Sequence, residues 1–348
     1  MAMTIVEATR LVTGGVDTHL DVHVAAALDA NGGVLGVESF PTTTHGFADL
    51  HGWLAGFGEV TQVGVEGTGA YGAGLTRHLL SQRIKVIEVD RPNRQARRVH
   101  GKSDTLDAVE AARAVQSGRA SGLAKTGTGN VEAIRALLVA KRSGRETRVA
   151  CLNQIRHLGF CAPDDLRERL RDLPKTQIAQ VAAALRPGAA ADPVTHATKT
   201  ALRTLGRRVL AIEDDAAVID AHLARLVEAT APNLLELYGV GVDTAAILLA
   251  AAGDNPERLA TESAWAALCG VAPLPASSGK VTRYRLNRGG NRQANSALWR
   301  IALTRMSSDP RTRTYVQRRL DEGLTKKEIM RVLKRYIARE VYRQLPRR

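Results

Sequence analysis

The chain has 348 residues, which is too long for one compact core and indicates two or three domains. Apolar residues make up 44% and charged residues 24%, as in ordinary globular proteins. The sequence contains no run of 18 apolar residues, which argues against a membrane span. The three cysteines lack CxxC spacing, which argues against a disulfide framework or a zinc site. Because the first ten residues lack the apolar core of a signal peptide, we expect a cytoplasmic protein.

Charge is unevenly distributed along the chain. The net charge is +14, yet residues 1–90 carry four Lys/Arg against ten Asp/Glu, whereas residues 279–348 carry 20 basic residues against five acidic ones. A basic surface of this size predicts a polyanionic partner, and the acidic first part predicts a bound cation such as a metal ion. The alternative is that both are merely solvated surfaces of opposite sign.

Strand and helix signals alternate through the first 90 residues. Short apolar runs predict strands over residues 11–17, 22–28, 34–39, 62–66 and 84–89, and helical spacing predicts helices over 45–57 and 71–81. Asn-Gly-Gly at 31–33 predicts a hairpin turn between the second and third strands. Three antiparallel strands followed by helix, strand, helix and strand is the order of the ribonuclease H-like fold, so we expect an α/β domain of that class.

The middle of the chain has a helical pattern. Apolar spacing predicts helices over residues 106–115, 131–160, 164–185 and 199–229, with a loop at 117–130 and an Ala/Gly/Pro break at 187–193. Long amphipathic helices with a shared apolar stripe favour a coiled-coil arm or an oligomer interface. A helical bundle within one chain is the alternative.

The last third of the chain is predicted to be mainly helical and basic. Gly-Val-Gly at 239–241 leads into a helix that ends near residue 250, which is typical of a helix–hairpin–helix element whose backbone amides bind phosphate, although plain turn chemistry also explains it. A short helix at 265–269, a loop or small hairpin at 273–291 and basic helices at 293–306 and 326–344 follow. We therefore expect three domains, at residues 1–125, 126–230 and 231–348.

Four acidic residues stand at positions that can converge on one point. Asp17 and Glu66 end two predicted strands, and Asp104 and Asp107 lie at i and i+3 in the first turn of a predicted helix. Carboxylates this close repel one another unless a cation neutralises them. Oxygen donors without His or Cys indicate Mg²⁺ or Mn²⁺ rather than zinc.

Two of these acids also have a simpler explanation on their own. Asp104 could cap its helix, and Asp17 could be a turn residue at the end of a strand. His19 is close enough to assist Asp17, but a lone histidine of this kind is more often a surface residue.

Several motifs occur in one order along the chain. They are Val-Asp-Thr-His at 16–19, Glu-Gly-Thr-Gly-Ala-Tyr-Gly at 66–72, Lys-Ser-Asp-Thr-Leu-Asp-Ala at 102–108, Tyr-Gly-Val-Gly at 238–241, Cys-Gly-Val-Ala-Pro at 269–273, Ser-Ser-Gly at 277–279 and Arg-Gly-Gly-Asn at 288–291. Together they resemble the DEDD transposases of bacterial insertion sequences, which have a RuvC-like N-terminal domain and include bridge-RNA-guided recombinases. The resemblance spans residues 15–315, nearly the whole chain.

The resemblance implies a role for particular residues. It implies that Asp17, Glu66, Asp104 and Asp107 are the metal-binding tetrad and that Ser278 is the nucleophile on DNA phosphate, with Ser277 as a neighbour that the alignment of one sequence does not separate from it. The Lys-x-Gly-Asn element of the family is Arg-Gly-Gly-Asn here, so the lysine position holds Arg or Gly. The residues expected to contact phosphate are Lys280, Arg283, Arg285, Arg288 and Asn291.

We therefore expect a transposase or site-specific recombinase that cuts and rejoins DNA with Mg²⁺ or Mn²⁺ and a serine nucleophile. The resemblance further implies guidance by a structured RNA, assembly into a dimer or tetramer through the helical arm, and a place at the bacterial nucleoid. One rival is a RuvC-like nuclease or Holliday-junction resolvase that uses metal-activated water. The other is a nucleic-acid-binding protein without enzymatic activity, whose acids are structural.

Overall fold

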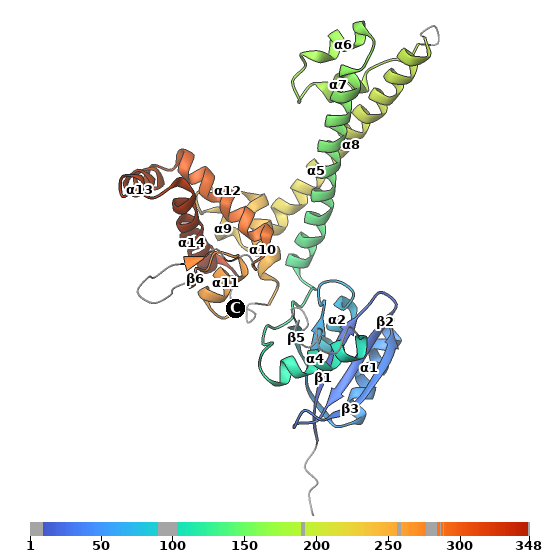
Figure 1. The fold of residues 1–348 in the computed structure, drawn as a ribbon, viewed down its shortest axis with the longest axis vertical. Coiled ribbons are helices and arrows are strands. Elements are labelled where there is room, and N and C mark those ends of the chain that lie inside the picture. The colour runs from blue at the N-terminus through green and yellow to red at the C-terminus, as the bar shows by residue number, and fades with distance from the viewer. Residues whose placement is uncertain are drawn as a thin grey trace, which may run out of the picture. The chain divides into compact units, whose positions relative to one another are not determined.

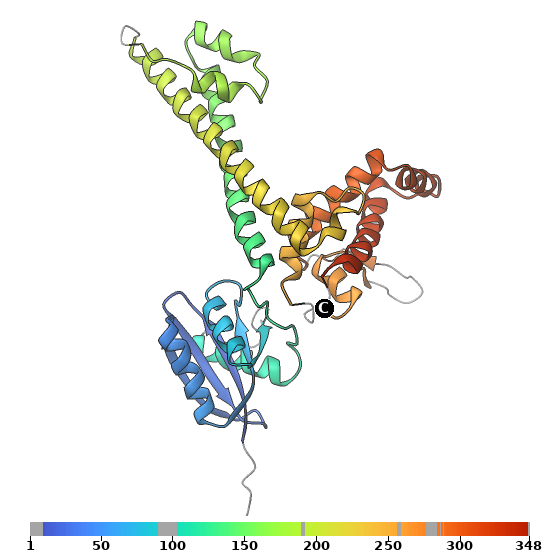
Figure 2. The ribbon, with the colours of Figure 1, turned by 180° about the vertical axis from the view of Figure 1, so that it is seen from behind.

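The computed structural model describes residues 10–89, 103–188, 192–255, 259–275, 284–285, 287 and 289–346. The chain divides into two compact units (Figures 1 and 2). The first unit takes in residues 1–132, 251–291 and 345–348, and the second takes in residues 133–250 and 292–344. The three domains expected from the sequence remain a prediction.

A five-stranded mixed sheet forms the centre of the first unit. Its strands are β1 (Leu11–Thr18), β2 (Val22–Leu28), β3 (Val34–Pro41), β4 (Glu59–Glu66) and β5 (Lys85–Val89). They lie in the order β3-β2-β1-β4-β5, with β1, β2 and β3 antiparallel and with β4 parallel to both β1 and β5. This confirms the expected α/β domain and is consistent with a ribonuclease H-like fold.

Helices cover both faces of this sheet. On one face, α1 (Thr44–Gly56) and α2 (Ala73–Ser81) bury Leu50, Leu54, Leu75 and Leu79 against the valines of β1 and β4. Thr43 begins α1 by accepting a hydrogen bond from the amide of Gly46 at 3.1 Å. On the other face lies α4 (Asp104–Gln116), which contributes Ala108, Ala111 and Val115 to the core.

Two glycines allow α4 to lie unusually close to the sheet. Gly15 of β1 and Gly64 of β4 are directly opposite each other in the parallel register. A Cβ atom on Gly15 would lie 2.2 Å from the carbonyl oxygen of Ala108, and one on Gly64 would lie 2.8 Å from that of Ala111. Any side chain here would force the helix outward, so this glycine pair sets the position of α4.

The far end of α4 is also tied to the sheet. The amide group of Gln116 donates hydrogen bonds to the carbonyl oxygens of Asp29 and Ala30, at 2.8 and 3.1 Å, in the turn between β2 and β3. Close packing along the helix and polar contacts at its end therefore hold it in one register on the sheet.

The first unit also contains α11 (Glu262–Leu268) and a two-stranded hairpin of β6 (Leu274–Pro275) and β7 (Tyr284–Arg285). Two of the sequence motifs meet beside α11. The amide of Asn291 donates to the carbonyl of Leu268 at 2.6 Å, and a Cβ atom on Gly290 would lie 2.2 Å from the amide nitrogen of Gly270. The Cys-Gly-Val-Ala-Pro and Arg-Gly-Gly-Asn motifs are thus in backbone contact, which only glycine permits.

The second unit is helical in its described part, which confirms the expectation of a mostly helical remainder. Its helices are α5 (Asn130–Phe160), α6 (Asp164–Arg171), α7 (Ile178–Ala183), α8 (Pro193–Thr230), α9 (Pro232–Leu235), α10 (Val242–Ala252), α12 (Arg292–Ser308), α13 (Pro310–Asp321) and α14 (Lys326–Gln344), with the first residues of α5 and the last of α10 lying in the first unit.

Helices α5 and α8 pack on each other within the chain. Arg148 pairs with Glu213 at 2.6 Å, Lys141 pairs with Asp220, and Leu152 shares a core cluster with Leu202. Residues later in α5 contact residues earlier in α8, so the two helices are antiparallel. The apolar stripe is therefore used at least partly inside one chain, and assembly of several chains through it remains a prediction.

Several helices differ from the sequence prediction. The expected helix at 164–185 is two helices, because Pro174 follows α6 by three residues and cannot continue its hydrogen bonding. Helix α8 begins at residue 193 rather than 199, since Asp192 accepts hydrogen bonds from the amides of Val194 and Thr195, both at 3.0 Å. Helix α13 was not predicted, although Asp309 caps it in the same way ahead of Pro310.

A buried arginine links three segments of the last third of the chain. Arg305 of α12 donates to the carbonyl oxygen of Tyr238 and to Glu340 of α14, both at 2.8 Å. The Gly-Val-Gly turn before α10 is present, with Gly239 at a φ of +78°. Phosphate binding by this turn remains a prediction.

Among the described residues, no helix is both long and apolar enough to cross a membrane.

The glycine pair under α4 makes a prediction about stability. Replacing Gly15 with Ala should lower the free energy of unfolding by about 3 kcal/mol, because the new methyl group overlaps the backbone of α4. Gly52 is the matched control: it lies in α1 with nothing within 4 Å of its Cβ position, so Gly52→Ala should raise stability by roughly 0.5–1 kcal/mol. Urea denaturation followed by circular dichroism measures the free energy of unfolding of both variants. A Gly15→Ala protein as stable as wild type would show that the position of α4 does not depend on Gly15.

Candidate metal centre

The parallel pairing of β1 and β4 places Asp17 and Glu66 side by side. The last register pair of these strands is Val16 with Val65, and the two acids follow directly. Because side chains alternate along a strand, each acid points to the same face as the glycine two residues before it, which is the face under α4. The hydroxyl of Thr18 donates to the carbonyl oxygen of Glu66 at 2.7 Å and joins the two strand ends.

The first turn of α4 carries the other two acids. The N-cap residue is Ser103, so Asp104 is the first helical residue, and its explanation as the helix cap is wrong. Asp107 is buried, with 4% of its surface exposed, whereas Asp104 is half exposed. Carboxylates at the N-terminus of a helix are favoured by its dipole, which reduces the repulsion between these acids.

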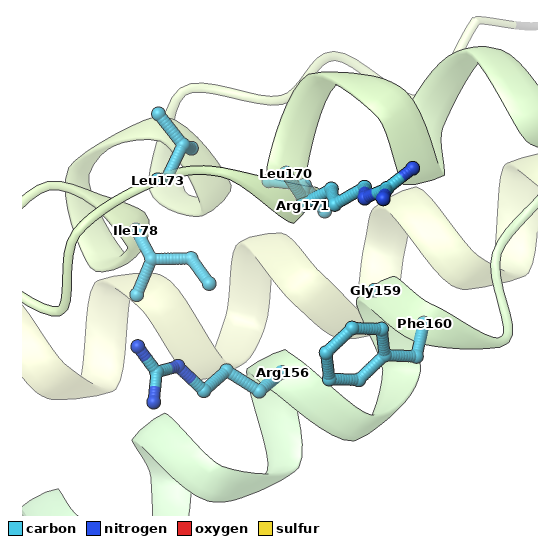
Figure 3. Close-up of a pocket in the computed structure, with 7 residues that line it drawn as sticks. All are labelled: Arg156, Gly159, Phe160, Leu170, Arg171, Leu173 and Ile178. Atoms are coloured by element: carbon cyan, nitrogen blue, oxygen red, sulfur yellow. The ribbon is translucent and has the colours of Figure 1, made fainter.

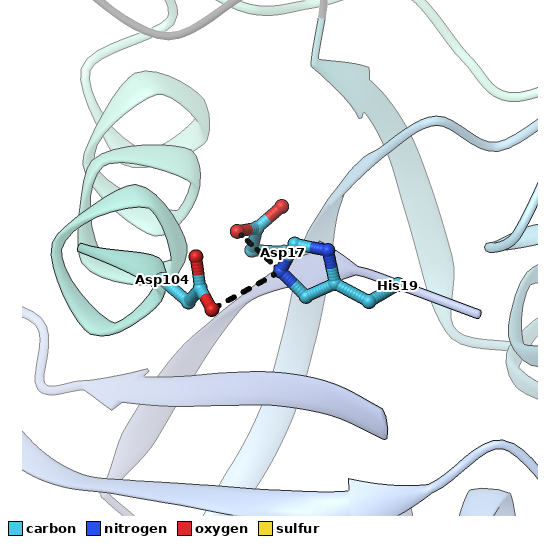
Figure 4. A group of neighbouring side chains, drawn as sticks. All are labelled: Asp17, His19 and Asp104. Atoms are coloured by element: carbon cyan, nitrogen blue, oxygen red, sulfur yellow. Dashed lines mark ion pairs between the residues drawn. The ribbon is translucent and has the colours of Figure 1, made fainter. Parts of the chain in front are cut away.

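Three side chains converge between the strand end and the helix start. Asp17, His19 and Asp104 each offer one ligand atom, and these atoms all lie within 4.8 Å of one another. Nε2 of His19 lies 3.2 Å from Oδ2 of Asp17 and 3.4 Å from Oδ2 of Asp104 (Figure 4). Among the described residues, Glu66 and Asp107 do not belong to this group.

The donor set of this centre suits a divalent cation. Two carboxylates from different elements face each other, and a cation between them would remove their repulsion. Nε2 of His19 is buried and, within the described part of the chain, makes no hydrogen bond despite its two acidic neighbours. The structure therefore adds a histidine to a site that the sequence predicted to contain acids alone. The signal in the sequence that could have identified His19 as a ligand is its position two residues after Asp17.

A second histidine lies on the opposite face of the sheet. His23 is fully buried in β2 and stacks on Phe47 of α1, with 5.7 Å between ring centres. Burial, and after it the nearby His19, lowers the pKa of His23. The ring is therefore neutral near pH 7, so it packs as an apolar group and adds no charge beside the acids.

Most residues predicted to act on DNA phosphate lie outside the described residues. These are Ser277, Ser278, Lys280, Arg283 and Arg288. Arg285 is placed only through its backbone, in β7, and Asn291 through its amide on Leu268. Their roles remain predictions.

The second unit contains a pocket of different character (Figure 3). It has a volume of about 290 Å³ and is lined by Arg156, Gly159, Phe160, Leu170, Arg171, Leu173 and Ile178, from α5 to α7. None of these lining residues is an acid, a histidine or a cysteine, so the pocket lacks the donors for metal or acid–base chemistry.

Comparison with known proteins places two transposase models on the chain. A DEDD transposase model matches residues 14–158, the segment that holds Asp17, Glu66, Asp104 and Asp107. A model described as the IS116/IS110/IS902 family of transposases matches residues 231–317, the segment that holds Ser278 and its basic neighbours. The chain thus carries the two domains of an insertion-sequence transposase in their expected order.

Two relatives come from insertion elements of actinobacteria. A 43.6 kDa protein of insertion element IS110 from Streptomyces coelicolor is 34% identical over 136 residues, which is 38% of this chain and 33% of the relative. A 42 kDa protein of insertion element IS900 from Mycobacterium paratuberculosis is 28% identical over 134 residues, 38% of this chain and 34% of the relative. The matched segments span about a third of each relative. The chain belongs to the IS110 family of transposases.

The metal centre predicts how divalent ions change stability. Wild-type protein should gain about 2.7 kcal/mol when the ion is present at 100 times its dissociation constant, since the ion binds only the folded chain. Asp17→Asn should abolish this gain and leave metal-free stability unchanged or higher, because one of two facing carboxylates is neutralised. Asp49→Asn, at an exposed acid of α1, should behave as wild type in thermal denaturation with and without MnCl₂. A full gain in Asp17→Asn would remove that residue from the centre.

Proposed function

We propose that this protein cleaves and rejoins DNA during transposition of an insertion element. The observation that carries the proposal is the convergence of Asp17, near the end of the central strand β1, and Asp104, at the start of α4, inside the segment matched by the DEDD transposase model. Glu66, beside Asp17 in the strand register, and Asp107, one turn along α4 from Asp104, complete the proposed tetrad. Mg²⁺ is the proposed ion of the reaction, with Mn²⁺ as a substitute.

The chain holds the acids at the site through its backbone packing. Asp17 and Glu66 are held by strand pairing, and Asp104 and Asp107 by the contact of α4 with Gly15. When bound, a divalent ion supplies Lewis-acid activation of the attacking oxygen and neutralises charge on the phosphate. The carboxylates would hold this ion between the end of β1 and the start of α4, where it would offset the negative charge of the carboxylates and of the phosphodiester.

Ser278 is the proposed attacking group. Its hydroxyl oxygen forms a bond to phosphorus, and the bond from phosphorus to the leaving oxygen of DNA breaks. The serine proton is released to solvent, and the leaving oxygen takes up a proton from solvent and becomes a DNA hydroxyl. The phosphodiester is exchanged rather than hydrolysed, so a DNA hydroxyl can reverse the step and rejoin the strand. A serine hydroxyl needs a base, a metal ion or nearby cations to act as a nucleophile. Lys280, Arg283, Arg285 and Arg288 lie within ten residues of Ser278 in the sequence and are proposed to bind the phosphate and stabilise its charge.

The basic last part of the chain is the proposed nucleic-acid surface. Residues 279–348 hold 20 basic residues against five acidic ones. A basic surface of this kind binds the phosphates of a nucleic acid largely independently of the base sequence. Asn291 and the Gly-Val-Gly turn before α10 are proposed to add phosphate contacts. Guidance by a structured RNA, a dimer or tetramer formed through α5 and α8, a RuvC-like reaction geometry and a place at the nucleoid follow from family membership and belong to the same proposal.

Replacing Ser278 separates transesterification from hydrolysis. Ser278→Ala should abolish cleavage and strand exchange and leave nucleic-acid binding within about twofold of wild type, because one hydroxyl contributes little to a surface with many phosphate contacts. Wild-type protein incubated with element-end DNA, cognate RNA and Mg²⁺ should yield a protein–DNA adduct that survives denaturation and gel electrophoresis. Ser277→Ala is the matched control and should still form it.

Two other outcomes would change the proposal. Continued cutting by Ser278→Ala, with no adduct from wild type, would show hydrolysis by metal-activated water and favour a junction resolvase. Loss of the adduct only in Ser277→Ala would move the nucleophile by one residue. Binding without any metal-dependent cleavage would favour the non-enzymatic alternative.

Salt dependence tests the nucleic-acid surface. The logarithm of affinity for duplex DNA should fall linearly with the logarithm of salt concentration, by about 0.9 for each phosphate neutralised. Arg283→Ala with Arg285→Ala should weaken binding to all sequences and reduce this slope by roughly 2. The control pair is Arg207→Ala with Arg208→Ala, two exposed arginines of α8 outside the basic segment, which should leave the slope unchanged. A slope that responds only to the control pair would place the surface on α8.

A further inference from the structure

We propose that His19 is a nitrogen ligand of the metal centre and that it makes the centre prefer Mn²⁺ over Mg²⁺. This inference rests on the proposed function, because it requires that the acids bind a divalent ion. It differs from the all-oxygen site that the sequence predicts, and it concerns a residue outside the proposed tetrad.

The position of His19 is unusual for a surface histidine. It follows the end of β1, two residues after Asp17, and 41% of its side chain is exposed. Nε2 itself is buried, and it faces the carboxylates of Asp17 and Asp104 (Figure 4). Within the described residues this nitrogen makes no hydrogen bond, so its two contacts have the distance of an ion pair but not the alignment of a donor and an acceptor.

The separations match those of ligand atoms that share one ion. Atoms about 2.1 Å from an octahedral ion are about 3 Å apart when they are neighbours in the coordination shell. Nε2 of His19 is 3.2 Å from Asp17 and 3.4 Å from Asp104, and all three ligand atoms lie within 4.8 Å of one another. A small inward movement of each group would bring all three atoms into the shell of one cation, which leaves the remaining positions for other ligands such as water.

A nitrogen donor changes which ion the centre favours. Mg²⁺ binds oxygen ligands almost exclusively, and imidazole raises affinity for transition metals. Two carboxylates with one imidazole form a mixed nitrogen and oxygen set, which an octahedral Mn²⁺ ion accepts. We therefore expect the centre to bind Mn²⁺ more tightly than Mg²⁺, and His19 to account for the difference.

His45 provides a matched comparison within the same chain. Its Nε2 lies 3.5 Å from Oδ2 of Asp49, a distance close to those of His19. The pair lies on the surface of α1 at i and i+4, with 89% of the His45 side chain exposed, and it involves one carboxylate instead of two. It is a solvated ion pair of the ordinary kind, so its removal controls for the loss of any histidine next to an acid.

The experiment measures metal binding directly on the full-length protein. Isothermal titration with MnCl₂ and with MgCl₂ is compared for wild type, His19→Gln and His45→Gln, with circular dichroism to show that all three are folded. His19→Gln should weaken Mn²⁺ binding roughly tenfold or more and change Mg²⁺ binding less than twofold, since glutamine offers no imidazole nitrogen. His45→Gln should match wild type for both ions.

Pulsed electron paramagnetic resonance gives a second readout that a structural role would not change. Mn²⁺ bound to wild-type protein should show coupling to a ¹⁴N nucleus, which ¹⁵N-labelled histidine replaces and His19→Gln removes. Bound Mn²⁺ without nitrogen coupling, or equal Mn²⁺ affinity in wild type and His19→Gln, would overturn the role of His19 and leave the acidic centre in place. Failure of wild type to bind either ion would overturn the metal centre itself, and the proposed function with it.

Discussion

The close contact between α4 and the sheet is the constraint on which the candidate site depends. Gly15 and Gly64 face each other across β1 and β4 and leave room for the backbone of the helix. Because this contact sets the height and register of α4, it also sets where the first turn of the helix lies relative to the strand ends. Asp17 and Asp104 are 87 residues apart in the sequence, and this packing brings them together.

The division of charge along the chain corresponds to the division of chemical tasks in the proposed function. The acidic first segment collects carboxylates that repel one another and so favour a cation, while the basic last segment favours phosphate. The two transposase models match residues 14–158 and 231–317, which include most of the acidic segment and the first part of the basic one. The function proposed here needs a metal ion and a polyanionic substrate. Family membership and elementary electrostatics therefore lead independently to the same assignment.

Histidine 19 shows how a site can differ from the motif that predicts it. In the sequence it is one polar residue after a strand, and such residues are usually solvated. In the structure its Nε2 atom is buried and lies 3.2 Å from Asp17 and 3.4 Å from Asp104. A single nitrogen among carboxylates is a small change in composition, but it alters the order in which divalent ions are preferred.

The sequence by itself determined the order of strands and helices in the first unit, the pairing of β2 with β3 through Asn-Gly-Gly, and the candidate acids, because alternation, helical spacing and turn residues are local signals. The tertiary structure alone decided that Gly15 lies under α4 and that the ring of His19 lies next to Asp104. Such contacts join residues distant in the chain or depend on packing against a neighbouring element. Their energies come from close approach and burial, which the pattern of one segment does not contain.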